Sequence, residues 1–151
     1  MAQFSDILDR APSEIEKPKP LPVGTYICVV DGLPEHGESS KKKTPYVRFK
    51  LKFLSAEDDV DQDELAAWAK KGDGSSRSLG DARLNNDYYI TEDAIWRLKD
   101  FLSHLGIEEQ DSLRQMIESA PGSQVKVFLR HEASEDGQSV FARVGNTAAV
   151  D

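Results

Sequence analysis

The stretch from Lys41 to Phe53, KKKTPYVRFKLKF, constrains the fold of this chain most, because its side chains alternate in character. Apolar residues recur at every second position from Val47 to Phe53, and tyrosine or basic residues lie between them. A period of two predicts a half-buried β-strand with one face toward a core and the other toward solvent or a ligand. A plainer interpretation is that the lysines only keep the strand soluble and discourage edge pairing.

Composition limits the class of protein. The 151 residues fit one domain, and the single cysteine, Cys28, excludes an intramolecular disulfide and lies in an apolar run that favours a core position. No apolar run is long enough for a membrane span, and the N-terminus lacks a signal-peptide pattern, so we expect a soluble, cytoplasmic protein. The formal net charge of −8 argues against a classical basic nucleic-acid-binding domain, but the basic charge is segregated into the 41–53 stretch.

The first half of the chain divides into an arm, two strands and an insertion. Residues 1–22 are expected to form a Pro-rich arm with a short helix around residues 4–8, and residues 23–147 a single domain followed by a short tail, 148–151. A strand is predicted over 23–30, then a polar loop, then the alternating strand. Residues 56–78 are interpreted as an acidic insertion that contains a brief helix anchored by Trp68.

The second half predicts strands around two helices. Thr91 is expected to cap the first helix and Gly106 to stop it. The expected elements are a strand over 79–90 with a bulge in the tract 85–87, a helix over 91–105, a helix over 111–119, and strands over 124–132 and 139–144.

A hairpin turn at Asp136-Gly137 would place Arg130 directly opposite Arg143. Like charges directly opposite each other destabilise a sheet. A bound anion would remove the conflict, and a longer turn would avoid it without any ligand.

The order of three strands, a helix and a closing hairpin predicts a mainly β, α+β fold. A five-stranded antiparallel OB-like barrel has this arrangement, with its helix between strands 3 and 4 and here an acidic insertion between strands 2 and 3. A β-sandwich with peripheral helices is the competing architecture.

Cations and aromatic rings alternate on the expected outward faces of three strands. Cations neutralise phosphates, and rings stack bases without reading their identity. For either phenylalanine alone, packing beneath the arm or the second helix is the simpler interpretation. The candidate nucleic-acid-binding residues are Lys41, Lys42, Lys43, Tyr46, Arg48, Lys50, Lys52, Lys126, Phe128, Arg130, Phe141 and Arg143.

Five pieces of the sequence resemble a known family: PVGTYICVV, a basic loop, the alternating YVRFKLKF, the stretch NNDYYITEDAIWRLKDFLSHLGI, and a terminal hairpin ending near Gly145-Asn146. Over residues 21–147 this pattern is similar to phage-encoded single-stranded-DNA-binding proteins, first catalogued as a phage domain of unknown function. The most specific part is the strand-to-helix junction, with Asn86, Tyr89, Thr91 and the run Trp96-Arg97-Leu98. We interpret these junction residues as structural.

The resemblance implies an OB-like fold and sequence-tolerant binding of single-stranded DNA during phage replication or recombination, in the cytoplasm of a bacterial host. Phage or host replication proteins would then be partners. The chain departs from the usual outline of such binders, because it ends in GNTAAVD and carries its acids in the run from Glu57 to Glu64. That departure puts tail-mediated recruitment of replication partners in doubt.

Metal and catalytic motifs are absent from the sequence, so we expect neither a cofactor nor enzymatic activity. The three histidines are far apart, and the calcium-loop pattern that begins at Asp59 fails at Glu64 and Lys70. A different hypothesis is an acidic protein-interaction module, or a DNA-mimicking inhibitor, that works through the acids from Glu57 to Glu64. A third combines the two, with the insertion competing for the basic face.

Overall fold

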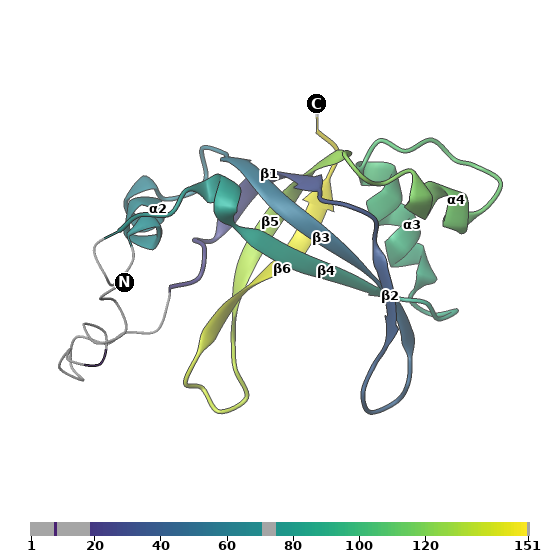
Figure 1. Ribbon diagram of the computed structural model, residues 1–151, viewed down its shortest axis with the longest axis horizontal. Helices are drawn as coiled ribbons and strands as arrows, with labels where there is room; N and C mark the ends of the chain where they lie inside the picture. Colours follow the sequence, from purple (N-terminus) through teal and green to yellow (C-terminus); the bar gives the residue numbers. More distant parts are fainter. Residues whose placement is uncertain (1–7, 9–18, 71–74, 151) are drawn as a thin grey trace.

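The sheet is organised around β3 (Pro45–Ala56), which pairs with three other strands in this computed structural model (Figure 1). The structure describes residue 8, residues 19–70 and residues 75–150. One edge of β3 pairs with β1 (Gly24–Val30) and β2 (Glu35–Glu38), and the other edge pairs with β4 (Arg83–Tyr89). β5 (Gln124–Ala133) pairs with β1, and β6 (Val140–Ala148) pairs with β5, all antiparallel.

The core lies on the inward face that the alternation predicts. Val47, Phe49, Leu51 and Phe53 are fully buried, so the assignment of faces along β3 is confirmed. Cys28 of β1 is also fully buried, and this burial raises the pKa of its thiol to about 12. The inward residues of β5 complete this side of the core: Val125, Val127 and Leu129.

Within residues 19–70 and 75–150, three helices and a short 3₁₀ turn flank the sheet. α2 (Gln62–Ala69) lies at one end of the molecule, and α3 (Ile95–His104) and α4 (Leu113–Glu118) lie together at the other end (Figure 1). Trp68 anchors α2 in the core, and Gly106 ends α3 with a φ of 80°, both as predicted. The 3₁₀ turn η2 (Leu79–Asp81) leads into β4.

The structure differs from the sequence expectations at several places. The strand expected over 79–90 begins at Arg83, because residues 79–81 form η2. Residues 35–38, expected to be loop, form β2, so the sheet has six strands rather than five. The register between β3 and β4 runs without a break, so the bulge expected at 85–87 is wrong; Asn86 instead points inward and donates to the Tyr88 hydroxyl at 3.0 Å. α3 begins at Ile95, and Thr91 accepts a hydrogen bond from the Ala94 amide in the preceding turn.

The pairings form one mainly antiparallel sheet with a few helices, which confirms the α+β class. This single sheet is not the two-sheet sandwich. Among the described residues β4 pairs only with β3 and β6 only with β5, so closure into a barrel is not confirmed. The helix expected around residues 4–8 falls outside the described residues except for Leu8, which is helical and exposed.

Candidate nucleic-acid interface

Outward side chains of β3 and β4 form a ladder of cross-strand pairs, which we call the β3–β4 face. Such directly opposed side chains are close enough to interact. The pairs are Tyr46 with Tyr89, Arg48 with Asp87, Lys50 with Asn85, and Lys52 with Arg83. β2 widens this ladder, because Glu35 lies opposite Arg48 and Gly37 lies opposite Tyr46.

Carboxylates hold two of the predicted cations on this face. The Arg48 guanidinium donates to both oxygens of Asp87, at 2.8 and 2.9 Å, and this pairing raises the pKa of Arg48. The Lys50 ammonium lies 2.7 Å from a Glu35 carboxylate oxygen and lowers the pKa of that carboxyl below its ordinary value. The face is therefore charge-compensated rather than uniformly basic.

Aromatic rings lie directly beside these ion pairs. Arg48 lies over the Tyr46 ring at 5.1 Å from its centroid, and Tyr89 meets the same ring edge-on at 6.4 Å. Gly37 of β2 leaves room for the Tyr46 side chain, since a Cβ there would lie 2.6 Å from the tyrosine oxygen. Tyr46 is thus fixed in place, whereas Tyr89 remains 48% exposed.

The turn between β2 and β3 presents three lysines to solvent. It is closed by hydrogen bonds from the Ser39 amide to the Thr44 carbonyl, at 2.9 Å, and from the Lys43 amide to the Ser39 carbonyl, at 3.0 Å. Lys43 has a φ of 56°, which a tight turn of this kind requires. Lys41, Lys42 and Lys43 are all exposed, beside the end of β3 that carries Tyr46.

The second group of predicted residues lies on what we call the β5–β6 face. It comprises Lys126, Phe128, Arg130 and Glu132 of β5 together with Phe141 and Arg143 of β6. Arg130 does lie opposite Arg143, but the chain turns through the longer loop 135–138 in the same register. Glu132 approaches Arg143 at 3.0 Å, so a carboxylate of the protein itself relieves the conflict between the arginines. Neither ring is buried: Phe128 is 38% and Phe141 45% exposed.

β1 separates the two faces. In the sheet order, β1 lies between β3 and β5, and its outward residues there are Thr25, Ile27 and Val29. None of these carries a charge. The twelve predicted residues therefore form two patches with an uncharged strip between them, although the β2–β3 and β5–β6 hairpins project from the same side of the molecule (Figure 1).

Sequence reasoning missed two groups of residues. The carboxylate partners Glu35 and Asp87 come from other strands, so no local pattern could reveal them. Tyr89 and Trp96 are large rings at the β4–α3 junction, and Trp96 is 55% exposed. The alternation along β4 could have revealed Tyr89, because this residue lies on the same outward face as Arg83, Asn85 and Asp87.

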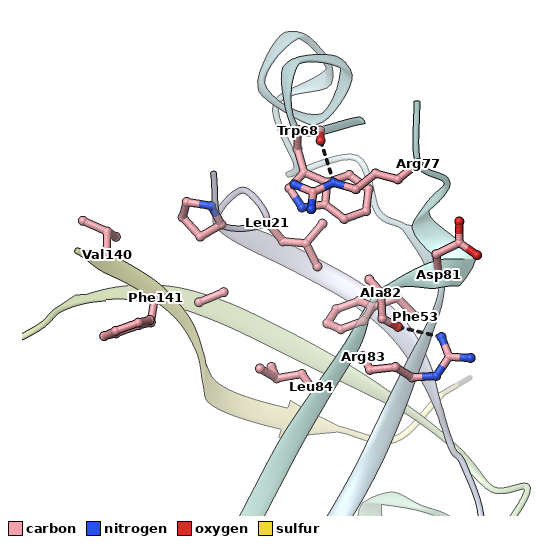
Figure 2. A pocket seen from close by; sticks show the side chains of 12 residues that line it. Leu21, Phe53, Trp68, Arg77, Asp81, Ala82, Arg83, Leu84, Val140 and Phe141 are labelled. Carbon is pink, nitrogen blue, oxygen red and sulfur yellow. Dashed lines mark hydrogen bonds between the residues drawn. The ribbon is translucent and has the colours of Figure 1, made fainter. Parts of the chain in front are cut away.

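A pocket of about 450 Å³ lies between α2, the start of β4 and the start of β6 (Figure 2). Phe53 and Leu84 line its apolar part, and Phe141 stands at the β6 side. Arg77 lies over the Trp68 ring at 4.1 Å and donates to the Trp68 carbonyl at 2.8 Å. Trp68 also lines the pocket, but Arg77 covers one face of its ring and only 5% of the residue is exposed.

Two of the three histidines make hydrogen bonds within the fold. His104 Nδ1 lies 2.7 Å from the Thr147 hydroxyl, and His131 Nε2 lies 2.7 Å from the Leu21 carbonyl. Among the described residues, no group of three or more His, Cys, Asp or Glu side chains is arranged to hold a metal ion. No helix in this part of the chain is both long and apolar enough to cross a membrane.

Comparison with known proteins gives little beyond this geometry. No family model matches the sequence, and no curated protein matches it. Among solved structures the chain is similar to one described as "Yeast RPA bound to ssDNA", at 6% identity over 98% of this chain and 86% of that chain, with a TM-score of 0.32. A TM-score of this size does not establish a common fold.

Proposed function

We propose that the protein binds single-stranded DNA without enzymatic activity, through the β3–β4 face and the lysine turn. The observation that carries this proposal is that Tyr46, Tyr89 and Arg48 lie together beside the exposed lysines 41–43. Cations beside accessible rings match a phosphate backbone with unpaired bases, since a ring can stack on a base only when that base is exposed. Stacking also tolerates every base, which favours sequence-tolerant binding.

The further parts of the proposal rest on the order of elements and on the resemblance described above. The strand order, with α3 and α4 between β4 and β5, supports an OB-like barrel. Phage DNA replication or recombination in a bacterial host is the setting that the resemblance implies. Phage or host replication proteins would be the partners there.

Ion pairs on the face set the expected strength of binding. A phosphate that approaches Arg48 or Lys50 must displace Asp87 or Glu35, and the whole chain carries a net charge of −8. We therefore expect modest affinity that depends steeply on salt, with a log–log slope of about −0.7 for each phosphate contacted on a single strand.

Titration of oligo-dT and of a duplex of equal length, each at two salt concentrations, tests the proposal. We expect oligo-dT to bind more tightly than the duplex and to weaken as salt rises. The absence of salt-sensitive binding to oligo-dT at low ionic strength would refute the proposal.

A second candidate function, a protein-interaction module or DNA mimic built on the acids from Glu57 to Glu64, is less well supported. Asp59 accepts hydrogen bonds from the Thr25 amide and hydroxyl, Asp61 caps α2, and Glu57 lies 3.9 Å from Lys126. Half of this acidic run therefore serves the fold. The Lys126 contact also supports the third hypothesis, that the insertion competes for basic residues.

Neutralising the other three acids tests which of these functions the protein has, and it leaves Val60 and Trp68 in the core. The triple variant carries Asp58→Asn, Asp63→Asn and Glu64→Gln. A DNA binder retains or gains affinity for oligo-dT, whereas an inhibitor built on these acids loses its partner.

A further inference from the structure

Trp96 is exposed on a helix whose neighbouring apolar residues are buried. It is the second residue of α3, and 55% of its surface is accessible, whereas Leu98, Phe101 and Leu102 of the same helix lie in the core. Tryptophan is among the most costly side chains to leave in water, because its ring presents a large apolar area. Its exposure shows that the ring is not needed to pack α3 against the sheet.

Trp96 lies on a hollowed strip that continues from the β3–β4 face. One hollow, of about 450 Å³, is lined by Trp96 and Arg97 of α3, Tyr89 of β4 and Asn146 of β6. An adjoining hollow, of about 510 Å³, shares Tyr89 and also takes in Lys41 and Lys42 from the β2–β3 turn. The strip therefore runs from the lysine turn past Tyr89 to Trp96.

Cations accompany the rings along this strip. Lys41 and Lys42 border its first part, and the Arg97 guanidinium lies 5.4 Å from the Trp96 ring centroid in its second part. The acid beside Tyr89 in the ladder, Asp87, is already held by Arg48. Asp100 is the further acid that lines the second hollow.

We propose that Trp96 is a base-stacking residue, and that a single strand bound at the β3–β4 face turns past Tyr89 onto α3. This proposal rests on the proposed function and deepens it, because it gives the strand a path. Lys41, Lys42 and Arg97 would then contact the phosphates on either side of the stacked base. A path across β1 to the β5–β6 face would instead cross Thr25, Ile27 and Val29, which offer no cation.

The two tryptophans of the chain make this proposal directly measurable. Trp68 is only 5% exposed and is covered by Arg77, so a ligand in the strip can reach Trp96 alone. Addition of oligo-dT should quench part of the tryptophan fluorescence of the wild-type protein. Trp96→Phe should abolish this quenching, and Trp68→Phe should retain it.

Affinity provides the second measurement. Trp96→Ala should weaken oligo-dT binding about 5- to 150-fold, the range expected for loss of one stacked base, and Trp96→Phe should restore most of this affinity. The matched control is Phe141→Ala, which removes an exposed ring from the β5–β6 face and should leave affinity nearly unchanged. Because both side chains are exposed, each variant should keep its melting temperature within about 2 °C of wild type.

The outcomes separate this proposal from the proposed function. If oligo-dT does not bind at all, the proposed function fails and this inference fails with it. If oligo-dT binds Trp96→Ala with wild-type affinity, or if quenching persists in Trp96→Phe, the path over α3 is wrong, but the proposed binding of single-stranded DNA is retained. If a peptide but not oligo-dT quenches Trp96, the strip is a protein-docking surface and the proposal is overturned.

Discussion

The β3–β4 face and the β5–β6 face carry the same kinds of residue in the same alternation, but their neighbours make them different surfaces. On the β3–β4 face, Arg48 is flanked by carboxylates from strands on both sides, Glu35 and Asp87, and lies over a tyrosine ring. On the β5–β6 face, Arg143 faces another arginine and is balanced by a single acid, Glu132. Pattern along one strand therefore does not define a binding surface, because the adjacent strands determine which charges remain available.

Removing the cations of each face in turn should give the largest difference in oligo-dT affinity between the two faces. Arg48, Lys50 and Lys52 changed together to Ser should weaken oligo-dT binding at least about tenfold at roughly 0.1 M salt, since each lost phosphate contact lowers the magnitude of the salt slope by about 0.7. Lys126, Arg130 and Arg143 changed to Ser should have an effect of less than about threefold. Fluorescence anisotropy at several salt concentrations measures both variants.

Equal losses of oligo-dT affinity in the two triple variants would contradict the distinction between the faces. Both groups of cations would then contact the same single strand of DNA, as the sequence alone predicts. Thermal melts control for folding, because the ion pairs removed are solvent-exposed and contribute little to stability.

Releasing a single cation should have a smaller effect of the opposite sign. Asp87→Asn leaves Arg48 without its bidentate carboxylate, so the arginine can pair with a phosphate and affinity for oligo-dT should rise about two- to fivefold. Glu132→Gln is the matched change on the β5–β6 face and should not alter affinity. Unchanged binding in Asp87→Asn would show that Arg48 does not contact the ligand.

The smallest expected effect is a pH dependence that belongs to the β3–β4 face. Lys50 lowers the pKa of Glu35. The stabilisation from this pair is therefore fully present above the ordinary carboxyl pKa, and it is lost as pH falls through the lowered pKa. A phosphate on Lys50 would return the pKa of Glu35 toward its ordinary value, so binding takes up a proton in that window and affinity rises as pH falls. Glu35→Gln should remove this component and bind about twofold more tightly at pH 7. An identical pH profile in the two proteins would exclude Lys50 from the site.

Local sequence was sufficient for much of the fold. The alternation of Val47 to Phe53 identified the buried face, and the hairpin register placed Arg130 opposite Arg143. β2 was missed because EHGE has no apolar alternation and forms a strand only by pairing with the first half of β3. The tract around Asn86 wrongly suggested a bulge, because a polar residue points inward there. Asn86 donates to the hydroxyl of the partly buried Tyr88, and desolvation raises the pKa of Tyr88 to about 12.

The candidate site was predicted only in part, because its electrostatics are non-local. Arg48 and Asp87 are 39 residues apart, and only the β3–β4 register brings them together. Trp96 looked structural in the sequence because it flanks the buried stripe of α3. Its exposure follows from how that helix packs against the sheet, which the helical period alone does not determine.

The burial of Cys28 provides a reporter that touches neither face. It is the only thiol in the chain, it lies in the centre of β1, and its raised pKa keeps it unreactive while the fold is intact. A thiol reagent can therefore modify it only when the sheet opens, so the labelling rate measures the population of opened molecules. A ligand that binds the native state slows this labelling in proportion to its occupancy, which yields affinity without a mutation or a dye at the interface.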